Sequence, residues 1–266
     1  MSYRSLQATE TAETIFDDFL ARLEEKINDA SLDRNDVVRD TLYEMYFGQR
    51  ANVKNLYNHK YPIASRAVMA SFDPRNVTME PEYYSDIDID RYQSRKPLIW
   101  LWQMFDRSAL GGNLLLAFKF RRMLAPYIFR KVGKNFKCFH FVEWSFGYNL
   151  SIGDNVVIHR NVLLDDRGEI IIGNNVSISD YANIYSHSHS VTDIHDVSCK
   201  PTVIHDNVRL TYHSTVLAGI TVGENGMVGA MGLATRDVKP YHVNVGIPAK
   251  SVLLKPNAPD TYRKND

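Results

Sequence analysis

The sequence predicts a mainly β protein, a solenoid of six-residue units, preceded by an α-helical N-terminal region. Three observations lead to this prediction. Aliphatic or small residues recur at every sixth position through residues 204–234, and the same spacing recurs within residues 152–184. Residues 13–28 instead place apolar side chains at helical spacing. A period of six fits short strands joined by turns, with one aliphatic side chain per unit pointing into a shared interior.

The N-terminal region, residues 1–131, contains two helix patterns near its start. The segment ETIFDDFLARLEEKIN, residues 13–28, carries an apolar stripe along one face. The segment DVVRDTLYEMYFG, residues 36–48, follows it, and Gly48 provides a C-terminal stop. We expect both segments to be helices.

The rest of the N-terminal region contains one acidic segment followed by two apolar segments. Residues 71–97 are acidic and contain prolines, so we expect extended or looped chain there. Residues 97–108 and 113–133 are apolar and typical of helices, and the second of them leads directly into the first six-residue unit.

The six-residue units occupy residues 132–255, and a C-terminal tail, residues 256–266, follows. Eight-residue steps after Trp144 and Leu164 divide the first nine units into runs of three. Gly or Asn recurs just after the aliphatic position, where a tight turn needs a positive φ angle or a small side chain. The units begin at Val132, Cys138, Trp144, Ile152, Ile158, Leu164, Ile172, Ile178, Ile184, Ile204, Leu210, Val216, Val222, Val228 and Ala234.

The spacing breaks between Ile184 and Ile204. These positions are 20 residues apart where six would continue the solenoid, so 14 are surplus. An excursion of this kind lies on the surface, where function concentrates. It contains His187, His189 and His195. In an extended backbone the first two rings would point the same way, because they are two residues apart.

Two segments of the solenoid resemble the hexapeptide-repeat acyltransferases, which are left-handed parallel β-helices. They are FGYNLSIGDNVVIHRNVLLDDRGEIIIGNNVSISDYANIYSHSH, residues 146–189, and VIHDNVRLTYHSTVLAGITVGENGMVGAMGLATRDVKPYHVNVGIPAK, residues 203–250. Within that group the chain is most similar to the galactoside, maltose and nodulation-factor O-acetyltransferases. The resemblance covers about residues 132–255 and implies the left-handed coiling, which general rules of chain connection would not predict.

The resemblance implies transfer of an acyl group, expected to be acetyl, from coenzyme A to a hydroxyl of a sugar or glycan-like acceptor. The family carries its catalytic histidine five residues after an aliphatic coil position, which is His189 here. Imidazole suits a general base because its ordinary pKa, about 6.5, lies near working pH. The resemblance further implies direct attack without an acyl-enzyme, and nitrogen acceptors stay open.

On the acceptor side, the resemblance implies roles for His159, Asn161, Asp166 and His187. His159 stands where relatives commonly have an asparagine, and Asn161 is a candidate substitute. Asp166 falls near a substrate-contacting carboxylate of relatives, or else it closes a coil as an acidic turn. His187 either orients the substrate or is a polar loop residue.

On the donor side, the segment GAMGLATR matches the lining of the pantetheine groove, from which we carry over Ala230, Thr235 and Arg236. Small residues let the thin pantetheine arm lie against the coils, and a few cations suffice for the phosphates of the nucleotide end. Arg236, Lys239, Lys250 and Lys255 could provide these cations, and we assign the role to Arg236 and Lys250. The expected co-substrate is therefore acetyl-CoA or another acyl-CoA.

Two rival functions stay open. The γ-class carbonic anhydrases share this fold and hold zinc with three histidines, and His187 and His189 with His213 or His159 could do the same. A scaffold without catalytic activity would bind no coenzyme A. We expect no metal, because the chain has the acyltransferase ending VGIPAK and a loop of acceptor-flap length. Cys199 could be a nucleophile, but nothing in the sequence places a base beside it, and we interpret it as a small loop residue.

The composition excludes several other classes of protein. Lys and Arg total 31, as do Asp and Glu, so no net charge favours nucleic acid or an anionic membrane. The two cysteines, Cys138 and Cys199, exclude a disulfide framework. The sequence shows no basic-then-apolar leader and no run of eighteen apolar residues, so we expect a cytoplasmic protein without a membrane span. The resemblance also implies a homotrimer with active sites between subunits.

Overall fold

A computed structural model of the protein describes residues 4–50 and 61–263. The chain divides into two compact units, a helical one from Met1 to Ile128 and a β-rich one from Phe129 to Asp266. Each unit has its own buried apolar core. None of the helices within the described residues is both long and apolar enough to cross a bilayer.

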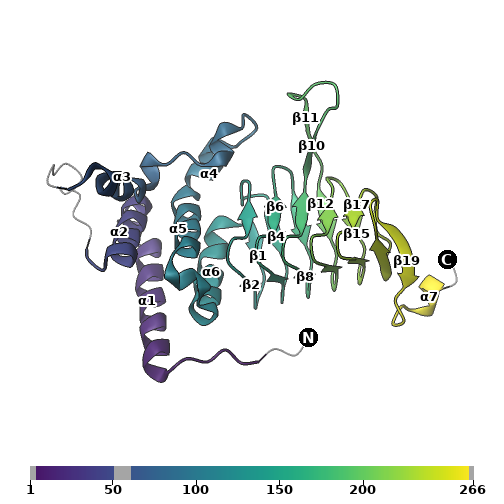
Figure 1. Cartoon of the computed structure of the whole chain (residues 1–266), viewed down its shortest axis with the longest axis horizontal. Helices are drawn as coiled ribbons and strands as arrows, with labels where there is room; N and C mark the ends of the chain where they lie inside the picture. The colour runs from purple at the N-terminus through teal and green to yellow at the C-terminus, as the bar shows by residue number, and fades with distance from the viewer. Residues whose placement is uncertain (1–3, 51–60, 264–266) are drawn as a thin grey trace. The chain divides into compact units, whose positions relative to one another are not determined.

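Within residues 4–50 and 61–128, the first unit contains six α-helices and three short 3-10 helices, most of which are labelled or visible in Figure 1. Thr9 caps the first of them, because its Oγ1 accepts a hydrogen bond from the Ala12 N–H at 3.3 Å. Gly48 ends the second in the left-handed conformation, with φ of 65°. The helices are α1 (Glu10–Asn28), α2 (Arg34–Phe47), α3 (Ile63–Ser71), η2 (Pro74–Asn76), η3 (Glu80–Tyr83), α4 (Ile89–Gln93), α5 (Lys96–Arg107), η4 (Ala109–Gly112) and α6 (Leu114–Ile128).

The four helices predicted from periodicity are confirmed as α1, α2, α5 and α6. The expectation of extended or looped chain over residues 71–97 was wrong in part, because η2, η3 and α4 lie there, and α3 was not predicted. Asp73 and Asp88 explain two of these short helices, since each side chain accepts a hydrogen bond from a backbone N–H in the following turn.

A buried ion pair fixes α5 against α6 in the core of the helical unit. Arg121 Nη2 lies 2.6 Å from Asp106 Oδ1, and the same nitrogen donates to the Gly111 carbonyl oxygen at 3.0 Å. Both side chains are almost fully buried. Their charges are therefore compensated locally, which is the condition for tolerating ions in an apolar core.

The second unit is a parallel β-helix built from three sheets. One sheet has the order β1-β4-β7-β12-β15, the second β19-β18-β16-β13-β8-β5-β2 and the third β17-β14-β9-β6-β3. The strands are β1 (Lys131–Val132), β2 (Lys137–Cys138), β3 (Glu143–Trp144), β4 (Leu150–Ile152), β5 (Val157–Ile158), β6 (Leu163–Asp165), β7 (Ile170–Ile172), β8 (Ser177–Ile178), β9 (Asn183–Tyr185), β12 (Thr202–Ile204), β13 (Arg209–Leu210), β14 (Thr215–Val216), β15 (Thr221–Val222), β16 (Met227–Val228), β17 (Leu233–Ala234), β18 (His242–Val245) and β19 (Lys250–Leu254).

Successive coils place equivalent residues on top of one another. Ile152 pairs with Ile172, Ile172 with Ile204, and Ile204 with Val222, and all four side chains are buried. These are first positions of the predicted six-residue units, so the spacing in the sequence is the spacing of the interior stacks. Parallel strands lie about 4.8 Å apart, so each coil advances the solenoid by that distance.

The turns between strands explain the recurring Asn residues. Asn135, Asn155, Asn175, Asn207 and Asn225 all have positive φ angles, and they occupy equivalent corners of successive coils. Asparagine tolerates the left-handed conformation better than other residues with a side chain. The turn chemistry of the sequence thus sets the corners of the coil.

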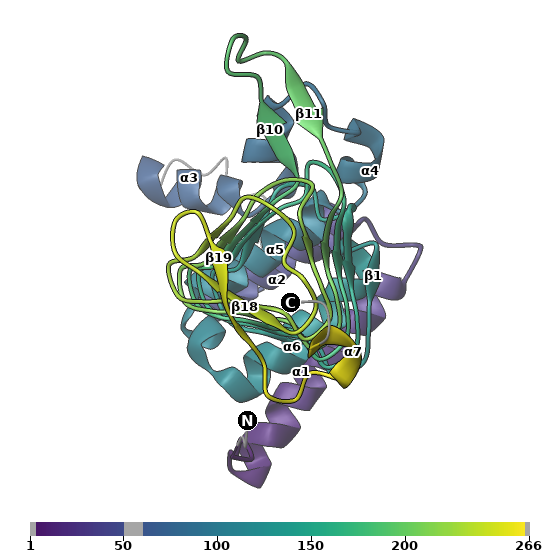
Figure 2. The ribbon, with the colours of Figure 1, turned by 90° about the vertical axis from the view of Figure 1, so that its right-hand side faces the viewer.

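The surplus residues between Ile184 and Ile204 form an antiparallel hairpin, β10 (His187–His189) and β11 (Val197–Cys199). The hairpin projects from the wall of the β-helix, as Figures 1 and 2 show. Its tip carries the exposed apolar side chains of Val191 and Ile194. The predicted excursion is confirmed, and it is more ordered than a simple loop because the two strands pair with each other.

Candidate active site

The β10–β11 hairpin presents both loop histidines on one face. His187 pairs with Cys199 and His189 with Val197, while Ser188 pairs with Ser198 between them. Because side chains alternate across a strand, the serines lie on the opposite face, where their Oγ atoms are 3.0 Å apart. The two imidazole rings meet with their centroids 5.2 Å apart and their planes at 82°.

His189 is anchored by one ring nitrogen and exposed to solvent. Its Nδ1 lies 2.7 Å from the carbonyl oxygen of Ile194 at the hairpin tip. A carbonyl can only accept, so in the neutral ring Nδ1 carries the hydrogen and Nε2 carries the lone pair. The local structure therefore prepares Nε2 of His189 to take up a proton.

His187 is anchored differently, by a carboxylate. Its Nδ1 contacts Oδ2 of Asp165, a residue at the end of β6 whose side chain is 6% exposed. The other carboxylate oxygen, Oδ1, accepts a hydrogen bond from Ser145 Oγ at 2.8 Å. A chain of polar contacts thus runs from the first coil through the second to the hairpin.

Ser186 joins the hairpin to the coil below it. Its Oγ donates to the Asp165 carbonyl oxygen at 2.5 Å and accepts from the Gly168 N–H at 2.9 Å. Its carbonyl oxygen accepts from the Lys200 N–H at 2.8 Å, which closes the base of the hairpin. The side chain of Ser186 is fully buried, so its hydrogen bonds at this junction are shielded from water.

Asp166 is turned away from the hairpin into the turn after β6. Its Oδ1 accepts from the Phe146 N–H at 2.7 Å and its Oδ2 from the Asn149 N–H at 3.2 Å. Complete burial raises its pKa to about 7, against the opposing effect of these hydrogen bonds. These contacts favour the acidic-turn interpretation of Asp166 and leave Asp165 as the carboxylate that faces the histidines.

His159 and Asn161 lie at another corner of the solenoid. They follow β5 and precede β6, whereas the hairpin leaves between β9 and β12. The His159 ring stacks on Phe139, with centroids 4.7 Å apart, and burial lowers its pKa. Asn161 adopts a positive φ of 55° in the turn. Within one chain the structure does not bring these two residues to the hairpin.

Two of the residues assigned to the acyl donor share a corner with the hairpin. Thr235 and Arg236 follow β17, which lies two strands beyond β9 in the same sheet, or about 10 Å along the solenoid. Both are exposed. Lys250 is also exposed and follows Ala249, whose N–H donates to the Leu233 carbonyl oxygen at 2.7 Å. Ala230 instead lies at the corner after β16.

Three contributors to the site were missed from the sequence. Asp165 and Ile194 contact the two imidazoles and Ser145 holds the Asp165 carboxylate, yet none of the three carries a motif of its own. Nothing in the sequence placed a base beside Cys199, whereas the structure makes His187 its direct partner across the hairpin. Only the alternation of Ser and His in SHSHS could have indicated a strand here.

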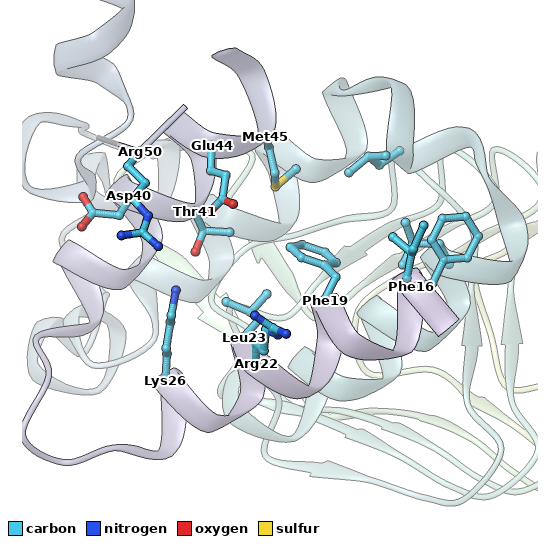
Figure 3. Close-up of a pocket in the computed structure, with 13 residues that line it drawn as sticks. Phe16, Phe19, Arg22, Leu23, Lys26, Asp40, Thr41, Glu44, Met45 and Arg50 are labelled. Atoms are coloured by element: carbon cyan, nitrogen blue, oxygen red, sulfur yellow. The ribbon is translucent and has the colours of Figure 1, made fainter. Parts of the chain in front are cut away.

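No group of three or more His, Cys, Asp or Glu side chains within residues 4–50 and 61–263 is arranged to hold a metal ion. The helical unit does contain a separate cavity of about 610 Å³ between α1 and α2. Figure 3 shows Phe16, Phe19 and Leu23 of α1 along it. No residue assigned to the site above lines this cavity.

Comparison with known proteins gave no match to any family model. Individual proteins do match. The galactoside O-acetyltransferase of Escherichia coli is 28% identical over 136 residues, which are 50% of this chain and 67% of that protein. A Staphylococcus aureus protein named as an acetyltransferase is 30% identical over 136 residues, 50% of this chain and 68% of that one.

Solved structures agree with these sequence matches. A maltose O-acetyltransferase from Clostridium difficile superposes with a TM-score of 0.55 and 25% identity, covering 67% of this chain and 98% of that one. A galactoside acetyltransferase in complex with coenzyme A gives a TM-score of 0.56 and 25% identity, over 62% and 81% of the two chains.

The parallel β-helix, interrupted by one histidine-bearing hairpin, defines an acyltransferase of the left-handed β-helix class. The chain belongs to the hexapeptide-repeat acetyltransferase family.

Proposed function

We propose that this protein transfers an acetyl group from acetyl-CoA directly to a hydroxyl of a sugar or glycan-like acceptor, with His189 as the general base. The observation that carries the proposal is the contact between His189 Nδ1 and the Ile194 carbonyl oxygen at 2.7 Å. It leaves Nε2 as the basic atom on an exposed projection of the fold. Removal of the acceptor proton lets the oxygen attack the thioester carbon as the bond to sulfur breaks.

Acetyl-CoA is the proposed donor because the corner after β17 offers an extended surface with a cation. Thr235 and Arg236 lie there, and the small residues Ala218 and Gly219 occupy the same corner one coil earlier, between that position and the hairpin. A long, thin pantetheine arm fits along such a corner, and Arg236 with Lys250 would pair with the phosphates. The structural relative bound to coenzyme A supports this choice of donor.

A homotrimer is proposed because one chain holds only part of the acceptor site. His159 and Asn161 lie at a corner that the hairpin of the same chain does not share. A neighbouring subunit would supply these two residues next to His187 and His189. Velocity sedimentation of the purified protein tests the assembly, and a stable, active monomer would contradict it.

The function is tested by measuring thiol release from acetyl-CoA against a panel of sugars, amines and antibiotics. We expect acceptor-dependent release with at least one hydroxyl compound, and its loss in the His189→Ala protein. His195→Ala is the matched control, since His195 is exposed in the same hairpin and outside the anchored pair. Equal turnover by wild type and His189→Ala on every accepted substrate would reject His189 as the base.

A further inference from the structure

The hairpin carries a second anchored imidazole beside the proposed base. His187 Nδ1 faces Oδ2 of Asp165, as His189 Nδ1 faces the Ile194 carbonyl oxygen. Both rings lie on the same face of β10, with centroids 5.2 Å apart. In both residues Nε2 is therefore the atom left for a reacting group.

The two anchors differ in charge. The partner of His187 is a carboxylate, which is itself held by Ser145 Oγ at 2.8 Å. The partner of His189 is a neutral carbonyl. An imidazolium at His187 is paired with an opposite charge, as in a histidine–aspartate couple, whereas one at His189 is not. Two neighbouring groups in such different surroundings are suited to opposite proton-transfer tasks.

We propose that His187, held by Asp165, is the general acid that protonates the departing thiolate while His189 removes the proton from the acceptor. This role rests on the proposed function. The acceptor hydroxyl gives its proton to His189 Nε2, and its oxygen bonds to the acyl carbon. The carbon–sulfur bond breaks with its electron pair on sulfur, which takes the proton from His187 Nε2.

The cycle closes by moving one proton between the rings. After transfer His189 is an imidazolium and His187 is neutral, so the starting state returns when a proton passes from the first to the second. The ring centroids are 5.2 Å apart, and we expect one bridging water to carry the proton between them. No further reactant is needed.

Several titratable groups surround His187, and the experiment has to distinguish their effects on the pH profile from the effect of His187. Asp165 faces it from β6, His189 lies on its own strand, and Cys199 lies opposite on β11. Asp166 follows Asp165 in the chain but directs its carboxylate into the turn. A test therefore needs variants at the carboxylate and at the thiol as well as at His187.

The experiment is the pH dependence of kcat/KM for acetyl-CoA, measured with an acceptor from the thiol-release screen. Wild type should lose activity on the alkaline side, as expected for a step that needs a protonated acid. His187→Gln should be slower by about 10²-fold near neutrality and lack the alkaline fall. Asp165→Asn should begin its alkaline fall at lower pH. His195→Gln and Cys199→Ser should keep the wild-type profile.

The possible failures are distinguishable. If His187 only anchors the hairpin, the His187→Gln protein would be slower at all pH values and would keep the alkaline fall. That result would overturn the proposed role of His187 and leave the proposed function standing. An alkaline fall that vanishes in Cys199→Ser would assign it to the thiol and overturn the proposal in the same way. Absence of acceptor-dependent thiol release in every protein would overturn the proposed function, and the acid step with it.

Discussion

The ring of His189 is tied to the backbone of its own hairpin, with Nδ1 2.7 Å from the carbonyl oxygen of Ile194. The carbonyl belongs to the tip and not to the coil, so the hairpin itself fixes the orientation of the ring. The orientation of the proposed general base is thus set by a residue only five positions further along the chain.

This contact predicts the result of a shape-conserving substitution. In His189→Asn the side-chain amide can still donate to the Ile194 carbonyl, but nothing replaces Nε2. We expect the hairpin to keep its conformation while acetyl transfer falls by about 10²–10⁴-fold, the usual contribution of a general base. Thiol release measures the activity, and His195→Asn serves as the comparison. Activity of His189→Asn within a few-fold of wild type would contradict the assignment.

Gly168 lies where the start of the hairpin packs closely against the coil, so a larger residue there should disturb the hairpin. A Cβ at this position would lie 2.7 Å from the Ser186 carbonyl oxygen and 3.2 Å from the Cys199 Cβ. Gly168→Ala should therefore displace the hairpin and lower activity by about 10²-fold, as small misplacements of catalytic groups do. Circular dichroism should show the β-helix unchanged. Gly112→Ala, where an added Cβ meets nothing within 4 Å, should leave activity unaltered.

The buried carboxyl of Asp166 predicts a pH dependence of stability. Its pKa in the folded protein is about 7, against 3.8 as the ordinary value. The folded state holds the proton more tightly, so this stabilising contribution is complete below pH 3.8 and is lost as pH rises through 7. The free energy of unfolding relative to Asp166→Asn should thus decrease for wild type between about pH 5 and pH 8. Urea denaturation at both values measures it, and an unchanged difference would contradict the prediction.

The ion pair in the helical unit predicts a large loss of stability. Asp106→Ala removes the carboxylate that lies 2.6 Å from the buried guanidinium of Arg121, and breaking a buried pair in this way costs about 3–5 kcal/mol. Asp18→Ala removes the partner of an exposed pair, in which Arg22 lies 3.9 Å away, and should cost about 1 kcal/mol or less. Chemical denaturation compares the two variants. Equal small losses would show that the core does not depend on the Arg121–Asp106 pair.

The repeat made the β-helix predictable, because a stacked coil requires the same kind of residue at each turn. Ile152, Ile172 and Ile204 stack in the interior and recur in the sequence at positions that the coil length sets. The amphipathic pattern of residues 13–28 identified α1 for a similar reason, although Ile15 in that stripe is 59% exposed. Periodicity shows which face is apolar and does not show how much of it another element covers.

The partners of the site residues were less predictable. Asp165 and Asp166 are neighbours of the same type, and the resemblance favoured the second as a substrate-binding residue. The structure directs the carboxylate of Asp165 toward His187 and that of Asp166 toward the backbone of Phe146. Alternation along β6 and the turn after it decide between them, and a single sequence does not specify where a strand of three residues ends.

By itself, the sequence determined the coil, its turns, the point of interruption and the histidines placed there. Each of these is local or strictly periodic, so the identity and spacing of residues suffice. Only the tertiary structure decided that the interruption is a hairpin, that Asp165 anchors His187, and that His159 lies at another corner from His189. Those relationships depend on which coil stacks on which, and residues about 20 positions apart become neighbours only when the solenoid closes.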